Sequence, residues 1–198
     1  MKKLLKLSLM LAVVLTTAGM YANATDFSLI VKKETGKTVH FALNTTKEIQ
    51  LSIYDQDNVL VHAENISGGA NLNRIYNLDA LPKGVYFLEA ETELKTVVYE
   101  ITIVDDSAVL SSRPTAEVYK PTLVQQNGMV TLSILNFEET PINVTIYSKD
   151  GTEWLSKTFE GKVNFFKKFD MSQLPADTYT FEVAYNGRNF DNTINLKK

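Results

Sequence analysis

The chain contains 198 residues, with 20 Lys and Arg, 23 Asp and Glu, two His and no Cys. Without cysteine the protein has neither disulfide bonds nor a thiol nucleophile, so each folded unit depends on its hydrophobic core alone. The net charge of −3 argues against the basic surfaces that bind nucleic acids or anionic lipids, and we expect neither as a partner.

The first 24 residues have the three parts of a secretory signal peptide. Three lysines precede an apolar run over residues 7–15, and Ala22-Asn23-Ala24 provides a cleavage site of small residues. The apolar run is too short to span a bilayer, and no other segment is apolar enough to do so. We therefore predict a signal peptide over residues 1–24 with cleavage after Ala24, and an exported protein that is periplasmic, at the cell surface or extracellular.

The rest of the chain consists of two copies of one pattern. Residues 49–103 repeat as residues 142–196, at an offset of 93 residues. Within both copies apolar and polar residues alternate, as in Ile49, Leu51 and Ile53, which is the period of a half-buried strand. No window shows a convincing helical period. We expect about seven short antiparallel strands in each copy.

This pattern predicts an all-β fold with two tandem immunoglobulin-like antiparallel β-sandwiches, at residues 25–104 and 115–198. Residues 105–114 are polar, lack sustained alternation and end in Pro114, so we interpret them as a linker or a frayed strand end. A single large barrel of interleaved repeats is the alternative. The sandwich is favoured because the period matches the size of one sandwich domain.

A Leu-Pro-x-x-x-Tyr segment precedes the same strand in each copy, ending at Tyr86 and at Tyr179. A tyrosine that enters a strand after a turn can bury its ring and return its hydroxyl to the backbone a few residues upstream, as in the tyrosine corner of immunoglobulin-like domains. We expect this structural role for both residues rather than contact with a ligand.

Residues 53–61 (IYDQDNVLV) and 75–91 (IYNLDALPKGVYFLEAE) resemble the C-terminal sorting domains of the type IX secretion system, found in secreted proteins of the Bacteroidetes. The resemblance implies an immunoglobulin-like sandwich and a protein that reaches the cell surface. The first copy matches better: it keeps Gly84 but has Asn58 at the usual turn glycine, whereas the second keeps Gly151 but has Asp177 in place of the later glycine.

The tripeptide Asp106-Ser107-Ala108 is similar to the sites at which these bacteria attach O-linked glycans. The resemblance therefore makes Ser107 a candidate for O-glycosylation.

We find no constellation of catalytic or metal-binding residues. His40 and His62 each stand alone, without a second histidine or a carboxylate at ligand spacing. Asp55, Asp57 and Asn58 superficially resemble a calcium loop but lack its glycine and distal glutamate, so we assign them to a hairpin turn. We expect no catalytic residue, no metal and no cofactor, and a protein that is not an enzyme.

The second copy has more aromatic residues than the first. Trp154, Phe165-Phe166 and Tyr185 stand at positions held by Val61, Leu72-Asn73 and Thr92 in the first copy. They form either a larger core, which we favour, or a face that stacks on sugars or contacts a protein. Phe166 and Tyr185 are expected to face solvent, because each is out of phase with its apolar neighbours, and Trp154 is a further candidate for ligand contact.

We therefore expect a non-enzymatic exported protein that acts at the cell surface or in the extracellular matrix as an adhesion, assembly or binding module. Its partner would be a protein or a glycan, recruited by loops or sheet edges. One alternative makes the second domain a type IX sorting signal. Another makes the protein a carbohydrate-binding protein that uses the additional aromatic residues, and a hydrolase is the least favoured function.

Overall fold

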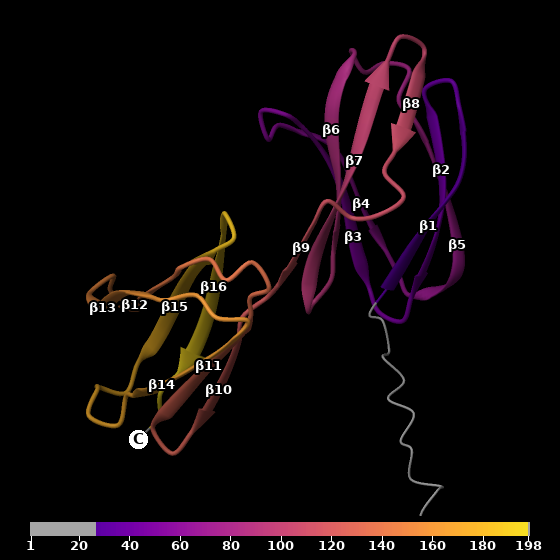
Figure 1. The fold of residues 1–198 in the computed structure, drawn as a ribbon. Helices are drawn as coiled ribbons and strands as arrows, with labels where there is room; N and C mark the ends of the chain where they lie inside the picture. Colours follow the sequence, from indigo (N-terminus) through magenta and orange to yellow (C-terminus); the bar gives the residue numbers. More distant parts are fainter. Residues whose placement is uncertain (1–26, 198) are drawn as a thin grey trace, which may run out of the picture.

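The computed structural model describes residues 27–197, and its regular elements are sixteen β-strands, β1 to β16. The strands form two sandwiches that follow one another along the chain (Figure 1). Within residues 27–197 no helix is long and apolar enough to cross a membrane. The predicted signal peptide and its cleavage site after Ala24 lie outside the described residues.

The first unit pairs a three-stranded sheet with a larger one. The smaller sheet has the order β1-β2-β5, with β1 (Phe27–Thr35), β2 (Thr38–Thr45) and β5 (Gly69–Asn77). The larger sheet contains β4-β3-β6-β7, with β3 (Ile49–Asp55), β4 (Leu60–Ile66), β6 (Gly84–Glu91) and β7 (Lys95–Val104). All pairings are antiparallel. Alternate residues such as Phe41, Ile53 and Leu88 fill the space between the sheets.

The second unit repeats this arrangement. Its three-stranded sheet has the order β10-β11-β14, with β10 (Thr122–Gln126), β11 (Met129–Leu135) and β14 (Asn164–Asp170). Its four-stranded sheet has the order β13-β12-β15-β16, with β12 (Ile142–Ser148), β13 (Glu153–Phe159), β15 (Thr178–Tyr185) and β16 (Arg188–Asn195). Each unit has a hydrophobic cluster of its own, so the tandem immunoglobulin-like sandwiches are confirmed and the interleaved barrel is wrong.

Local features repeat as closely as the strand order. The Tyr86 hydroxyl donates to the carbonyl of Pro82 and the Tyr179 hydroxyl to that of Pro175, each over 3.0 Å, so both tyrosine corners form. Asn58 and Gly151 occupy matched hairpin positions with φ of 59° and 86°. Both residue types tolerate positive φ, which explains how Asn58 replaces the usual turn glycine.

The structure corrects the predicted linker over residues 105–114. Ser107–Leu110 form β8, which pairs with Ile101–Val104 of β7, and Ala116–Tyr119 form β9, which pairs with Lys95–Val98 of the same strand. In β8 only Ala108 and Leu110 point into the core, an alternation too short to recognise in the sequence. The strand forms because β7 offers an open edge and the backbone of Ala108 also donates to the Gly36 carbonyl over 2.8 Å.

Candidate functional site

The structure does not bring the three aromatic candidates together. Phe166 lies on β14 and is 61% exposed, and Trp154 lies on β13 and is 45% exposed. The Trp154 ring contacts the buried Tyr179 edge-to-face at 6.4 Å between centroids. Tyr185, at the end of β15, is only 3% exposed. The predictions that Phe166 and Trp154 contact a ligand therefore concern two different sheets.

The prediction that Tyr185 faces solvent is wrong. Tyr185 continues the alternation of Tyr179, Phe181 and Val183, and all four side chains belong to the core of the second unit. Its hydroxyl donates to the carbonyl of Tyr119 at the end of β9. Burial raises the pKa of Tyr185 above its ordinary value. Tyr185 is thus part of the connection between the units.

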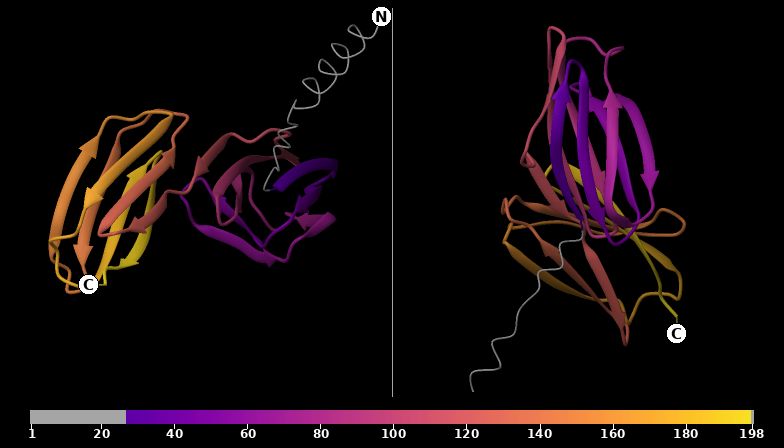
Figure 2. Two further views of the ribbon diagram at one scale, coloured as in Figure 1. Left: turned by 90° about the horizontal axis from the view of Figure 1, so that it is seen from below. Right: turned by 90° about the vertical axis from the view of Figure 1, so that its right-hand side faces the viewer.

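That connection depends on β9, which belongs to both units. Its backbone pairs with β7 of the first unit, while Val118 packs in the core of the second. Lys95 of β7 forms an ion pair with Glu117 over 2.6 Å and lies 5.4 Å from the Tyr119 ring centroid. These contacts span the junction visible from two further directions in Figure 2.

A second link runs from the far end of the chain back to the first unit. Arg188, the first residue of β16, forms an ion pair with Glu89 of β6, and both side chains are mostly buried. Glu89 lies on the outer face of the larger sheet, next to Ser52. The junction therefore has a shared strand, a tyrosine hydrogen bond and an ion pair, which together set the orientation of the units.

A groove of about 480 Å³ opens at this junction. One wall is Leu94, in the turn between β6 and β7, and the floor is the outer face of the sheet β10-β11-β14. The backbone N–H of Lys120 donates to the Leu94 carbonyl over 2.8 Å, so the turn is fixed against the end of β9. We refer to this feature as the junction groove.

The floor of the junction groove presents an aromatic ring beside hydroxyl groups. Thr122, Ser133 and Phe166 are register partners on three neighbouring strands, so their side chains lie side by side on one face. Leu135 and Asn164 form the next register pair on the same face of the sheet. The groove therefore combines apolar surface with polar groups that can form hydrogen bonds.

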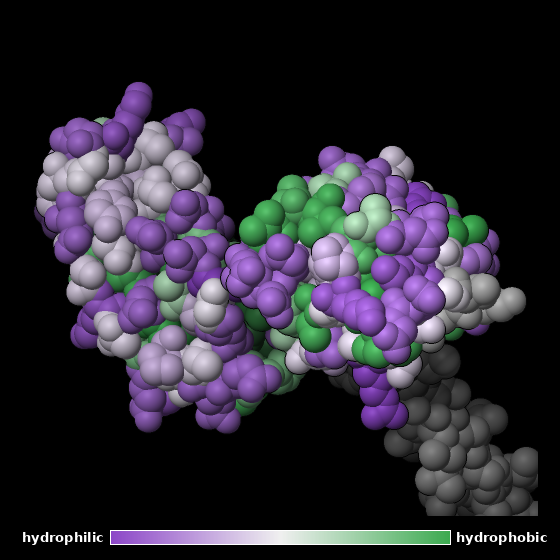
Figure 3. Space-filling view, turned by 90° about the horizontal axis from the view of Figure 1, so that it is seen from above, coloured by the Kyte–Doolittle hydropathy of each residue, from purple (hydrophilic) through white to green (hydrophobic). Residues whose placement is uncertain are grey.

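Surface hydropathy differs between the units. Seen from above, the first unit shows extensive hydrophobic areas, whereas the visible face of the second unit is mostly hydrophilic or neutral (Figure 3). Exposed apolar residues of the first unit include Val59, Leu60 and Val61, next to and within the edge strand β4. The exposed large hydrophobic residues of the second unit, among residues 27–197, are Val124, Phe137, Trp154 and Phe166.

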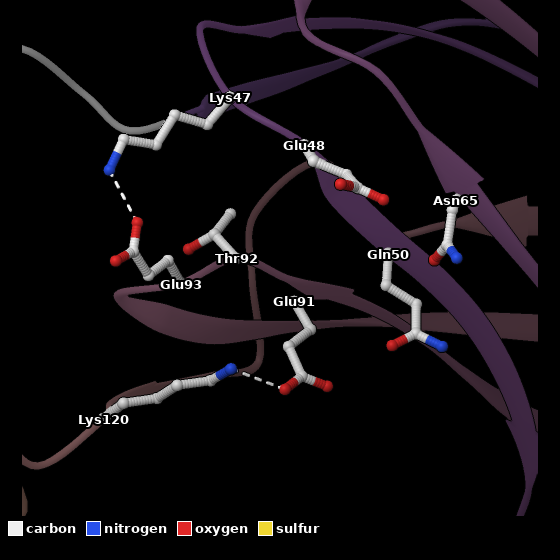
Figure 4. Close-up of a pocket in the computed structure, with 8 residues that line it drawn as sticks. All are labelled: Lys47, Glu48, Gln50, Asn65, Glu91, Thr92, Glu93 and Lys120. Carbon is white, nitrogen blue, oxygen red and sulfur yellow. Dashed lines mark hydrogen bonds and ion pairs between the residues drawn. The ribbon is translucent and has the colours of Figure 1, made fainter.

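A second hollow, lined by polar residues, lies on the first unit near the junction (Figure 4). Its charges are largely matched: Lys47 pairs with Glu93 over 2.8 Å, and Lys120 pairs with Glu91 over 2.6 Å. The hydrogen bond from Lys47 lowers the pKa of Glu93 below its ordinary value. Both carboxylates are thus engaged by cations at the surface of the first unit.

The remaining candidate residues lie apart from both hollows. His40 is half-buried on β2, and His62 is exposed on β4 with its ring edge-to-face to Tyr76 at 5.3 Å. Across residues 27–197 no three His, Cys, Asp or Glu side chains are grouped as metal ligands. Asp55 accepts hydrogen bonds from the backbone N–H groups of Asp57 and Val59, over 2.9 and 2.8 Å, which is the hairpin role predicted for this segment.

Ser107 is exposed at the start of β8, where the chain turns back along β7. Its Cα partner is Val104, and Asp105 in the turn between them has a φ of 51°. The hydroxyl is accessible, and O-glycosylation of Ser107 stays a prediction.

Sequence reasoning missed two residues at the junction. Phe137 is 56% exposed and contacts the Tyr119 ring edge-to-face at 5.8 Å, and Leu94 is 52% exposed. A comparison of the two copies could have identified Phe137, because it replaces Asn44 just as Phe166 replaces Asn73. Nothing in the sequence places Leu94 against the second unit, because that contact arises from the folded junction.

Comparisons with known proteins give one family match. Residues 35–104, which belong to the first unit, match the model of the secretion system C-terminal sorting domain. Comparison with curated proteins gives no match.

Three solved structures are similar at 10% sequence identity. A segment of two fibronectin type-III domains from chicken tenascin has a TM-score of 0.31, with coverage of 85% of this chain and 98% of that one. The BSP domain of a biofilm-associated protein has a TM-score of 0.31, and the match covers 84% of this chain but 29% of that one. The FN1–FN3 domains of chicken CNTN1 have a TM-score of 0.28, with coverage of 84% and 65%.

The sorting-domain match includes the two segments on which the sequence resemblance rests, and it falls on an immunoglobulin-like sandwich. Residues 35–104 are therefore similar to type IX C-terminal sorting domains, and this match indicates export through the type IX secretion system.

Proposed function

We propose that the protein is a non-enzymatic module that is exported to the cell surface and acts there in adhesion, assembly or binding. The match of residues 35–104 to the sorting-domain family carries the proposal, because that family is tied to export. The function is then expected to reside in the surface that the folded protein presents outside the cell.

The junction supports a binding role. β9, Tyr185 and the pair of Arg188 with Glu89 hold the two sandwiches in one orientation. A fixed orientation lets both units contribute to one binding surface without the entropy cost of ordering two free domains. Catalysis is not part of the proposal.

The accessibility of the protein to a protease added to intact cells tests whether it is at the cell surface. In a bacterium with a working type IX system, we expect external proteinase to degrade the protein and spare a periplasmic marker. In an isogenic strain without the translocon, the protein should accumulate in the periplasm and resist proteinase. Protection in both strains would contradict export to the surface.

The exposed position of Ser107 supports a separate proposal, that this hydroxyl carries a glycan. Intact-mass measurement of the exported protein should show added mass that Ser107→Ala abolishes, whereas Ser111→Ala, on the same segment, should retain it. Ser107→Ala itself removes one oxygen atom. A mass difference between wild type and Ser107→Ala no larger than that atom would contradict the proposal.

A further inference from the structure

We propose that the junction groove binds a saccharide chain, with the Phe166 ring as the surface on which a sugar ring stacks. The proposal rests on the surface function above and names the class of ligand that this function would serve. It concerns a site formed by both units, since Leu94 belongs to the first and Phe166 to the second.

The lining of the groove matches the chemistry of a sugar. A pyranose has an apolar face of C–H groups and a rim of hydroxyls, so it needs a flat apolar surface with hydrogen-bonding groups beside it. Phe166 provides an exposed ring, and Ser133 and Thr122 carry hydroxyls in the same register row. Asn164 adds an amide on the same strand as the ring. Aromatic rings of this kind give a large contact area with little loss of entropy.

Charge and size favour a saccharide over other partners. None of the described residues that line the groove is acidic, and Lys120, its one cation, pairs with Glu91. A nucleic acid would require several unpaired cations. The volume of about 480 Å³ lies in the range of sites for small ligands.

Comparison of the two units shows that two exposed rings near the junction have no aromatic counterpart in the first unit. Phe166 and Phe137 stand at positions that are occupied in the first unit by Asn73 and Asn44. Both asparagines lie on the small sheet of the first unit, at or near the end of β2 and on β5. The second unit thus carries two exposed rings where its own duplicate carries amides, and both rings lie close to Tyr119 or the groove it lines. A fold requirement shared by the copies does not explain them.

The wall of the groove that carries Leu94 is held in place independently of any ligand. Thr92 accepts hydrogen bonds from the backbone N–H groups of Leu94 and Lys95, each over 3.2 Å, and this closes the turn that carries Leu94. The site is therefore formed before binding, as expected for a ligand that is bound through few contacts.

Binding by the whole mature protein tests the proposal. The probes are cellohexaose, xylohexaose, laminarihexaose, chitohexaose, mannohexaose and hexagalacturonate, measured by calorimetry up to millimolar concentration. We expect at least one to bind, and Phe166→Asn, which installs the residue of the first unit, to weaken that binding about tenfold or more. Val124→Ala provides the control, because Val124 is exposed on the same sheet but does not line the groove.

Thermal unfolding of each variant separates loss of the site from loss of the fold. Weakened binding by Phe166→Asn at an unchanged melting temperature, with Val124→Ala like wild type, supports the site. Three outcomes overturn it: no binding to any probe, equal affinity of Phe166→Asn and wild type, or equal weakening by Val124→Ala. None of these changes the expected protease accessibility on cells, so failure of the site and failure of the surface function are distinguishable.

Discussion

Tyr86 and Tyr179 occupy the same place in the two units, and each uses its hydroxyl to fix the turn before its strand. Both rings are buried, and both hydroxyls donate to a proline carbonyl four residues upstream. Proline carbonyls in a turn lack a partner in the sheet, so the tyrosine provides one. The same contact occurs where the surrounding residues differ, which marks it as a requirement of the fold.

Removal of either hydroxyl should weaken the fold by a small, measurable amount. We expect Tyr86→Phe and Tyr179→Phe each to lower the free energy of unfolding by about 1 kcal/mol, because one hydrogen bond is lost and a carbonyl is left without a partner. Urea denaturation measures the change. Tyr54→Phe is the control, since Tyr54 is a half-buried residue whose hydroxyl has no hydrogen bond among residues 27–197. A loss as large in this variant would contradict the assignment.

Tyr185 predicts a dependence of stability on alkaline pH. Burial holds its pKa in the folded protein above the ordinary value of 10.0, so the folded state keeps the proton that the unfolded state releases. The stabilisation is complete below pH 10 and decreases as the pH rises further. Unfolding free energies from pH 9 to 12 should therefore fall less steeply for Tyr185→Phe than for wild type. Parallel curves for the two proteins would contradict this.

At the scale of elements, the edge strand β4 carries less charge than the edges β13, β14 and β16. Free edges normally carry charges that prevent pairing with another chain. The edges β14 and β13 carry Lys167, Lys168 and Lys157, and β16 carries Arg188 and Asp191. In β4 the one charged residue, Glu64, is half-buried and paired with Arg74, while Leu60 and Val61 are exposed. This edge is therefore open to pairing with another strand.

A charge on β4 should therefore reduce association between copies. We expect Val61→Lys to lower the sedimentation coefficient or turbidity of concentrated protein, with the unfolding free energy within about 0.5 kcal/mol of wild type. Ser156→Lys, on the edge β13, serves as the matched control and should leave association unchanged. An equal effect of both variants would show that net charge, and not this edge, controls association.

At the scale of the whole molecule, the two sandwiches are linked beyond the covalent chain. Arg188 reaches from β16 to Glu89 of β6, and a mostly buried cation that loses its partner destabilises the fold that holds it. A substitution that destabilises one unit should therefore also lower the stability of the other unit.

Trp154 makes that coupling measurable, because it is the sole tryptophan and lies in the second unit. Glu89→Gln is a substitution in the first unit. We expect it to lower the urea midpoint that tryptophan fluorescence reports, with a loss of unfolding free energy of about 1–3 kcal/mol. Glu93→Gln removes an exposed ion pair from the same unit and should leave that midpoint unchanged. Identical midpoints for wild type and Glu89→Gln would show that the units unfold independently.

The sequence was most informative where structure is local. Alternation predicted strands such as β3 and β12, and the Leu-Pro segments predicted both tyrosine corners, because neighbouring residues determine these features. The strand β8 was missed because its pairing depends on the open edge of β7. Phe166 was placed correctly from its phase, whereas Tyr185 was assigned the wrong phase. The junction groove could not be predicted, since Leu94 and Phe166 meet only through the contacts of β9.

The position of β9 also determines how the protein responds to proteolytic processing. Cleavage requires a segment that can leave the fold and extend into the active site of a protease. Between β8 and β9, the N–H of Ser111 donates to Glu100 and that of Thr115 to Val98, each over 2.8 Å, so the segment is anchored at both ends. Separation of the folded units by a protease would expose Val118 and the edge of β7 together. The folded junction is therefore expected to slow an enzyme that separates the two units.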